Sequence, residues 1–120
     1  ELNSARPADP RDTTTPGAMV ETLHTLLVSN SLAPAQNERF QTWLKGNTTG
    51  DKRLRGGVPR DWLVGDKTGS GSYGTTADIG IVYPPADAPW LLAVYFTQPE
   101  KNAALQEEVI AAVARLIVRE

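Results

Sequence analysis

Residues 61–97 read DWLVGDKT-GSGSYG-TTADIGIVY-PPADAP-WLLAVYFT, and this stretch decides the fold. Its runs of β-branched and aromatic residues, separated by glycine, serine and proline clusters, predict strands. The strands are expected at 61–68, 75–83 and 90–97. Their connections are short enough for antiparallel hairpins and too short for a helical crossover between parallel strands. The stretch therefore predicts an antiparallel meander.

Helical patterns precede this stretch. Thr15-Pro16 is typical of an N-cap followed by proline at the first helical position. The apolar spacing after it predicts a helix that runs to about Asn30. A second helix is expected from Pro34 to Lys45, with the next glycine as its stop. Two helices therefore come before the meander.

One more helix is expected after the meander. Asn102 is expected to cap it, and its apolar stripe has the spacing of a helix packed on a sheet. The stripe consists of Leu105, Val109, Ala112, Val113, Leu116 and Ile117. Residues 46–60 are expected to be irregular. The predicted fold class is α+β, an antiparallel sheet flanked by helices.

Composition and charge exclude several classes of function. The chain has 120 residues and a net charge of -2, so nothing favours binding to nucleic acid or to an anionic membrane. It has no cysteine and one histidine, so we expect no metal site and no cofactor. No apolar stretch is long enough to span a membrane. The chain opens on Glu1 without an initiator methionine, so we expect it to be cut from a longer protein.

Lys67-Thr68-Gly69 ends the first predicted strand with a cation, a hydroxyl and a glycine. Such an edge can bind an anion and can offer a backbone N–H to a reacting carbonyl. The tripeptide is also typical of an edge strand with a solvated lysine. The run 69–74 satisfies G-x-G-x-x-G, but a dinucleotide fold needs a helix after it, where a strand is predicted. An anion-binding edge is therefore favoured over a nucleotide loop.

Several further segments accompany this edge, in a fixed order. They are Leu2-Asn3, residues 9–16, residues 43–50 and residues 62–76. Together with K-T-G, they resemble the C-terminal half of class A serine β-lactamases, from just after the catalytic glutamate of the E-x-x-L-N loop to the C-terminal helix. The resemblance implies part of a three-layer α-β-α sandwich that is incomplete on its own. Its parts are an active-site loop (1–16), a helical part (17–58), and three strands with the C-terminal helix (59–120).

The resemblance implies hydrolysis of β-lactams through a serine acyl-enzyme. In that family the K-T-G strand forms one wall of the cleft. Lys67 is therefore expected to give the cleft a positive electrostatic potential and to hold the hydrogen-bond network of the active site. The hydroxyls of Thr68 and Ser70 are expected to bind the substrate carboxylate, with Gly69 and Ser72 on the same edge. The backbone N–H of Ser70 is expected to be one of two oxyanion-hole donors.

Four other residues receive roles from the resemblance. Asn3 matches the asparagine that helps to hold the hydrolytic water. Asp12 matches an aspartate that pins the loop through an ion pair with an upstream arginine that this chain lacks, so residues 1–16 are expected to be mobile if the segment is alone. Arg53 matches an arginine that supports carboxylate binding, and Thr49 is expected to help order that network. An alternative stays open, in which Arg53 is one of several exposed cations in residues 51–55.

The catalytic nucleophile is absent from the chain. No serine has a lysine three residues later, no Ser-Asp-Asn occurs, and the motif places the catalytic glutamate upstream of Leu2. Without a nucleophile no acyl-enzyme forms, so we expect the segment alone to be inactive, to fold poorly and to leave one sheet edge uncovered. The expected partners are a β-lactam and the N-terminal segment of the same enzyme, which carries S-x-x-K, S-D-N and the glutamate.

Two alternatives stay open. One is a penicillin-binding D,D-peptidase or transpeptidase, which shares K-T-G, although the Asn3 motif disfavours it. The other is a non-catalytic role, as an inactive complementation fragment or as a domain that only binds. The family resemblance also implies a bacterial protein that is periplasmic or secreted.

Overall fold

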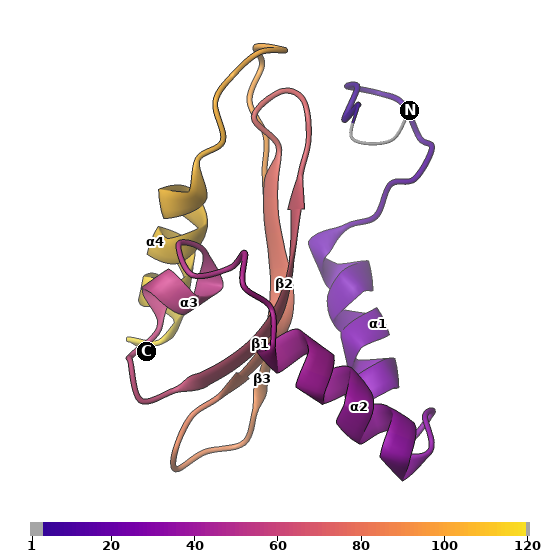
Figure 1. Cartoon of the computed structure of the whole chain (residues 1–120). Helices are drawn as coiled ribbons and strands as arrows, with labels where there is room; N and C mark the ends of the chain where they lie inside the picture. Colours follow the sequence, from indigo (N-terminus) through magenta and orange to yellow (C-terminus); the bar gives the residue numbers. More distant parts are fainter. Residues whose placement is uncertain (1–3, 120) are drawn as a thin grey trace.

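The computed structural model describes residues 4–119 (Figure 1). Its elements are α1 (Pro16–Leu27), α2 (Pro34–Lys45), α3 (Leu54–Gly57), β1 (Leu63–Ser70), β2 (Thr76–Tyr83), β3 (Trp90–Phe96) and α4 (Glu107–Ile117). The strands form one antiparallel sheet in the order β1-β2-β3. Helices α1 and α2 lie on one side of this sheet, and α3 and α4 lie on the other. The predicted meander and the α+β class are confirmed.

Local signals placed the first two helices well. Thr15 caps α1 through its side chain, which accepts a hydrogen bond from the Ala18 N–H over 3.2 Å, and Pro16 stands at the first helical position. The helix ends at Leu27, before the predicted Asn30, which has a left-handed φ of 57°. Helix α2 spans Pro34–Lys45 as predicted.

The C-terminal helix begins later than predicted. Asn102 lies in a turn closed by the bond from the Ala103 N–H to the Glu100 carbonyl, and α4 starts at Glu107. The N–H of Gln106, at the N-cap position, donates to the Thr76 hydroxyl on β2 over 3.1 Å. This tertiary bond holds the preceding segment against the sheet, so the expectation that Asn102 caps the helix is wrong.

Two other expectations need correction. Residues 46–60 contain the one-turn helix α3. The first strand covers 63–70 and not 61–68, because the Trp62 N–H closes a turn onto the Pro59 carbonyl and the pairing continues to Ser70. The shift places all of K-T-G inside β1.

Two clusters of buried side chains sit on opposite faces of the sheet. One lies under α3 and α4 and contains Leu54, Val64, Val82, Ile110 and Ala114. The other lies under α1 and α2 and contains Leu23, Leu27, Leu44 and Ile81. Side chains alternate between the faces of a strand, so Ile81 and Val82 of β2 belong to different clusters. The central strand β2 is therefore covered on both faces.

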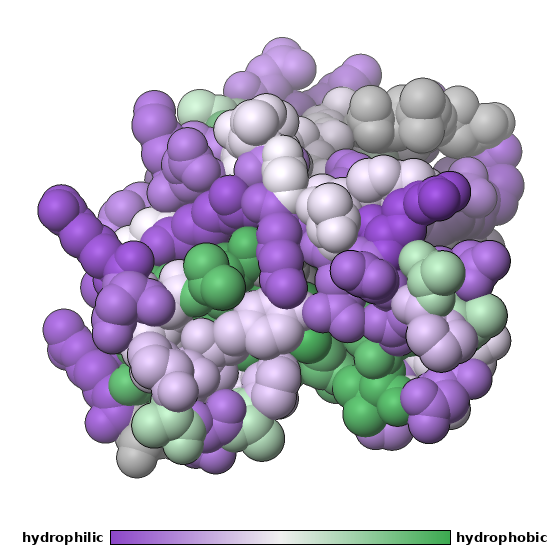
Figure 2. Space-filling view, turned by 60° about the horizontal axis from the view of Figure 1, so that its bottom comes forward, coloured by the Kyte–Doolittle hydropathy of each residue, from purple (hydrophilic) through white to green (hydrophobic). Residues whose placement is uncertain are grey.

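Apolar surface is nevertheless exposed. Figure 2 shows apolar side chains beside a hollow on the side that is the bottom of Figure 1. The large apolar residues with exposed side chains are Val28, Trp43, Leu63, Leu105 and Leu116. Among residues 4–119, β3 pairs only with β2, so one of its edges is open. No helix in this part of the chain is long and apolar enough to cross a membrane.

Gly80 is expected to tolerate no side chain. A Cβ there would lie 2.2 Å from the Gly65 carbonyl oxygen and 3.0 Å from the Asp66 Cα. These are backbone atoms of the paired strand, which cannot move without disturbing the ladder. We expect Gly80→Ala to lower the free energy of unfolding by about 3 kcal/mol, measured by guanidinium chloride denaturation of a protein that joins this chain to the N-terminal segment implied by the resemblance. Gly17→Ala is the matched control.

Nothing lies within 4 Å of a Cβ on Gly17, which is in the first turn of α1. Alanine favours helix there, so the control should be neutral or stabilising by up to about 1 kcal/mol. Equal effects of the two substitutions would contradict the tight strand contact at Gly80.

Candidate active site

The ladder between β1 and β2 determines which backbone groups of β1 are free. The Gly71 N–H donates to the Thr75 carbonyl over 3.0 Å. Ser70 and Thr76 are the next pair in the register. Pairs in an antiparallel ladder alternate between hydrogen-bonded and non-hydrogen-bonded, so the N–H of Ser70 points away from β2. Because β1 is an edge strand of the described sheet, this N–H points out of the sheet.

The side chains of β1 divide between the two faces of the sheet. Thr68 and Ser70 share a face with Asp66, whereas Lys67 points to the side of α1 and α2. Lys67 is exposed, and its Nζ donates to the Thr68 carbonyl over 2.6 Å. The strand end thus presents a cation, hydroxyls and an outward N–H within four residues.

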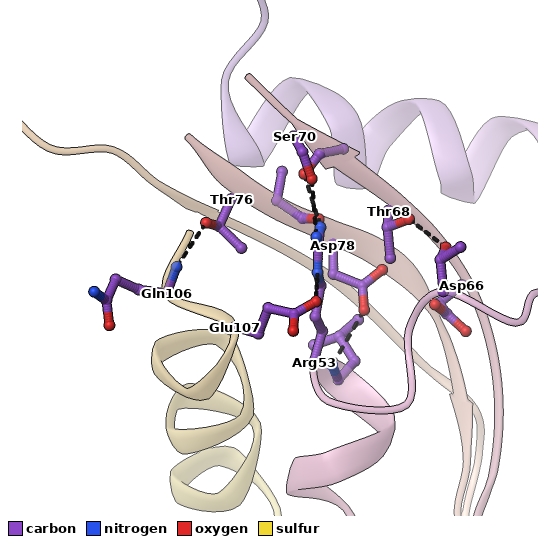
Figure 3. Close-up of polar contacts among 12 residues, drawn as sticks. Arg53, Asp66, Thr68, Ser70, Thr76, Asp78, Gln106 and Glu107 are labelled. Atoms are coloured by element: carbon purple, nitrogen blue, oxygen red, sulfur yellow. Dashed lines mark hydrogen bonds and ion pairs between the residues drawn. The ribbon is translucent and has the colours of Figure 1, made fainter. Parts of the chain in front are cut away.

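Arg53 is buried beneath this strand end. Only 4% of it is exposed. Its Nη1 donates to the carbonyls of Gly69 and Ala77, each over 2.7 Å, and its Nη2 donates to the Ser70 Oγ over 2.9 Å. Its Nε pairs with the Glu107 carboxylate at 3.2 Å (Figure 3). The alternative of an exposed cation is therefore wrong.

Arg53 also affects how Ser70 can bind. Because the Ser70 Oγ accepts a hydrogen bond from Arg53, the hydroxyl's own proton is free to point elsewhere. The guanidinium carries a permanent positive charge, which polarises the Ser70 hydroxyl as a donor. Ser70 is thus prepared to donate to an anion.

Thr49 lies beside Thr68, as the prediction of a supporting role requires. Their hydroxyl oxygens are 2.6 Å apart. The Thr49 hydroxyl also donates to the Asn47 Oδ1 over 2.9 Å. A hydroxyl has one proton, so Thr68 is the donor in the contact between the two threonines.

The tip of the β1–β2 hairpin is held by the segment after β3. The Tyr73 N–H donates to the Lys101 carbonyl, and the Gln98 N–H donates to the Tyr73 carbonyl, each over 2.8 Å. Tyr73 has a left-handed φ of 61°. Ser72 begins the turn, and its carbonyl accepts from the Thr75 N–H over 3.2 Å. Ser72 is therefore placed at a supported tip.

The N-terminal loop and the strand end enclose a cleft of about 580 Å³. Arg6 and Asp12 line it from the loop, and Gly69, Ser70 and Tyr95 line it from the sheet. Asp12 is exposed with a left-handed φ of 54°. Asn3 lies outside the described residues. The mobility expected for residues 1–16 stays a prediction.

The N-terminal loop contains an ion pair between two of its own residues. Arg11 pairs with Asp9 at 2.7 Å. The hydrogen bonds from Arg11 hold the pKa of the half-buried Asp9 carboxyl below its usual value. No group of three histidine, cysteine or acidic side chains that could hold a metal ion occurs in residues 4–119.

Known proteins are similar to this chain in sequence and in fold. A model described as the "Beta-lactamase enzyme family" matches residues 1–120. The chain belongs to the β-lactamase enzyme family. β-lactamase Toho-1 from Escherichia coli is 53% identical over 116 residues, which are 97% of this chain and 40% of that protein. A β-lactamase from Proteus vulgaris is 48% identical over 120 residues, which are 100% of this chain and 44% of that protein.

Structural comparison agrees. The solved β-lactamase from Streptomyces albus G matches with a TM-score of 0.95 and 40% identity, over 98% of this chain and 44% of that one. The resemblance to class A β-lactamases and the predicted fold class are confirmed. This β-lactamase-family chain spans less than half the length of these relatives.

Sequence reasoning missed several polar groups around the K-T-G strand. They are Asn47, Arg55, Asp66, Asp78 and Glu107. One signal was available, since strand alternation places Asp66 and Asp78 on the same face of neighbouring strands. The contacts of Asn47, Arg55 and Glu107 depend on tertiary packing, which no local pattern reveals.

Proposed function

We propose that this chain supplies the substrate-carboxylate and oxyanion wall of a site that hydrolyses β-lactams through a serine acyl-enzyme. One observation carries the proposal. The Ser70 N–H points out of a free strand edge beside the hydroxyls of Thr68 and Ser70. A β-lactam combines a strained amide carbonyl with a carboxylate, and this edge offers donors for both groups. The family and the relatives support this interpretation.

The carboxylate half of the site rests on charge and on hydroxyl donors. Thr68 and Ser70 donate to the substrate carboxylate, and Lys67 supplies positive field from the exposed side of the strand. Arg53 acts from beneath through Ser70. The Thr49 hydroxyl accepts the hydrogen bond from Thr68 until a ligand takes its place. Gly69 and Ser72 complete the edge.

The oxyanion half of the site rests on the Ser70 N–H. As a nucleophile attacks the lactam carbonyl, negative charge develops on its oxygen. A fixed N–H at that point stabilises the charge without rearranging. The second donor, the serine nucleophile, its lysine and the general base belong to the N-terminal segment of the same enzyme. Asn3 would help to hold the hydrolytic water, and Asp12 would pin the loop.

Joining the two segments tests the proposal. The joined protein consists of the N-terminal segment of β-lactamase Toho-1 followed by this chain. We expect the joined protein to hydrolyse a chromogenic cephalosporin, whereas either segment alone does not. The control is a joined protein whose N-terminal nucleophilic serine is replaced by alanine. A joined protein that folds, as judged by circular dichroism, but does not hydrolyse the cephalosporin would contradict the proposal.

Lys67→Ala should lower kcat/KM of the joined protein about 30-fold. A hydrogen bond to a charged group contributes about 2 kcal/mol, which corresponds to that factor. Lys67 is exposed, so stability should change by less than about 0.5 kcal/mol. Steady-state kinetics and thermal unfolding measure the two effects. Lys52→Ala, at another exposed lysine, should change neither. If both variants keep normal kcat/KM, Lys67 has no part in binding.

A further inference from the structure

Two carboxylates lie side by side in the interior, next to the candidate site. Asp66 of β1 is 1% exposed, and Asp78 of β2 is 0% exposed. The register pairs Thr68 with Asp78, so Asp66 and Asp78 are diagonal neighbours on one face (Figure 3). The loop before α3 covers them: a Cβ on Gly50 would lie 1.9 Å from the Asp66 Oδ2. Two buried negative charges need ion-pair or hydrogen-bond partners.

Only one of the two carboxylates, that of Asp66, has a described hydrogen-bond partner on each oxygen. Asp66 accepts from the Arg55 Nε over 2.6 Å and from the Asn47 Nδ2 over 2.5 Å. Asp78 accepts on Oδ2 from the Leu54 N–H over 3.1 Å, while its Oδ1 has no partner within the described residues. A buried polar atom without a partner is rare in folded proteins. A protonated carboxyl would resolve this, because it can donate.

The surrounding charges point the same way. Arg53 lies near Asp78, but its described hydrogen bonds go to Gly69, Ser70, Ala77 and Glu107. Arg55 of α3 pairs with Asp66. On β3, Val94 faces Asp78 and carries no charge. Burial, followed by the charge of Asp66, raises the pKa of Asp78 to about 7, against the opposing effects of the Leu54 N–H and Arg53.

We propose that Asp66 and Asp78 share one proton, carried by Asp78, and that this pair sets the direction of a hydrogen-bond chain that ends at Thr68. With the proton on Asp78, Asp66 stays a pure acceptor and must face the NH₂ group of Asn47. The Asn47 Oδ1 is thereby turned to Thr49, where it accepts hydrogen bonds from the hydroxyl and from the backbone N–H. Thr49 can then only accept from Thr68. Asp66 and Asp78 are thus positioning residues, which keep Thr68 a donor.

The consequence for binding rests on the proposed function, since a Thr68 hydroxyl held as a donor is ready to turn to a substrate carboxylate. The proton itself does not depend on that function. The raised pKa of Asp78 makes the stability of the fold depend on pH in one direction. A carboxyl whose folded pKa lies above its unfolded value stabilises the fold fully at low pH, and this stabilisation is lost as pH rises through about 7.

Infrared spectroscopy of the joined protein tests the shared proton. At pH 6 we expect a carbonyl-stretch band from a buried protonated carboxyl, absent in Asp78→Asn and present in Asp61→Asn, which alters an exposed aspartate. The amide that Asp78→Asn introduces is neutral and still donates, so the thermal midpoint of this variant should fall less between pH 5 and pH 8 than that of Asp61→Asn. A missing band, or parallel pH profiles, would overturn the shared proton whether or not the joined protein turns over β-lactams.

Kinetics and neutron diffraction test the chain to Thr68. An amide in place of Asp66 can turn its own NH₂ group to Asn47 and favour the reversed orientation of Asn47 against the Thr49 N–H. Asp66→Asn should therefore raise KM for a penicillin up to about 10-fold with a smaller change in kcat. Asp61→Asn, which alters an exposed aspartate, should keep KM within about 2-fold. Equal KM values in the two variants would overturn the directing role. If the joined protein is inactive or Asp66→Asn does not fold, neutron diffraction of the parent decides: deuterium between Thr68 and Thr49 on the Thr68 oxygen supports the chain, and deuterium on the Thr49 oxygen overturns it.

Discussion

Ser70→Pro is expected to lower kcat of the joined protein about 100- to 1,000-fold relative to Ser70→Ala, the range found for loss of one oxyanion donor. Both substitutions remove the hydroxyl and its bond with Arg53. Only proline also removes the backbone N–H. The difference between the two variants therefore isolates that N–H, measured as kcat for a chromogenic cephalosporin.

The fold should accept this proline. The Ser70 N–H takes no part in the ladder with β2, and proline is tolerated on edge strands where its nitrogen faces outward. We expect the thermal midpoints of Ser70→Pro and Ser70→Ala to agree within a few degrees. Equal kcat values in two folded variants would show that the Ser70 N–H does not stabilise the developing oxyanion.

Arg53→Ala is expected to lower the free energy of unfolding by about 3 kcal/mol. Breaking a buried ion pair destabilises by about 3–5 kcal/mol, and the lower end applies because the Glu107 side chain is 32% exposed and can be hydrated. The substitution also separates the loop before α3 from the ends of β1 and β2. Guanidinium chloride unfolding of the joined protein measures the change.

Arg115→Ala is the matched control for Arg53. Arg115 also pairs with a glutamate of α4, Glu108, but it is 38% exposed and its partner is 77% exposed. Exposed pairs contribute about 0–1 kcal/mol. Arg53→Lys should restore little, because an ammonium cannot reproduce a planar fork that serves acceptors on different elements. If Arg53→Ala and Arg115→Ala lowered the free energy of unfolding equally, the contacts of Arg53 would contribute no more to stability than an exposed ion pair.

The parts of the fold that sequence predicts well are those decided locally. Thr15-Pro16 started α1 as expected because both the cap and the proline act within one turn. The meander followed from its short connections. The start of α4 did not, because a bond from Gln106 to Thr76 on β2 decides it. That contact joins residues thirty positions apart, which no helical signal near Asn102 could reveal.

The site divides in the same way. Thr68 and Ser70 follow from the K-T-G motif and from strand alternation, and the structure puts them on one face. The sequence does not decide between Arg53 as a support for carboxylate binding and Arg53 as an exposed cation, because its acceptors come from β1, β2 and α4. The burial of Asp66 and Asp78 depends on the loop that covers them. Alternation could place these acids together but could not predict that cover.

Intact-mass spectrometry of the joined protein mixed with benzylpenicillin tests the central claim most directly. We predict an adduct with the added mass of one penicillin, which appears early and disappears as the substrate is hydrolysed. The variant without the N-terminal nucleophilic serine should show no adduct. An adduct that persists would contradict the proposal that the loop of Asn3 supports hydrolysis of the acyl-enzyme. A folded joined protein that neither forms an adduct nor hydrolyses benzylpenicillin would contradict the claim that this strand is one wall of a β-lactam acylation site.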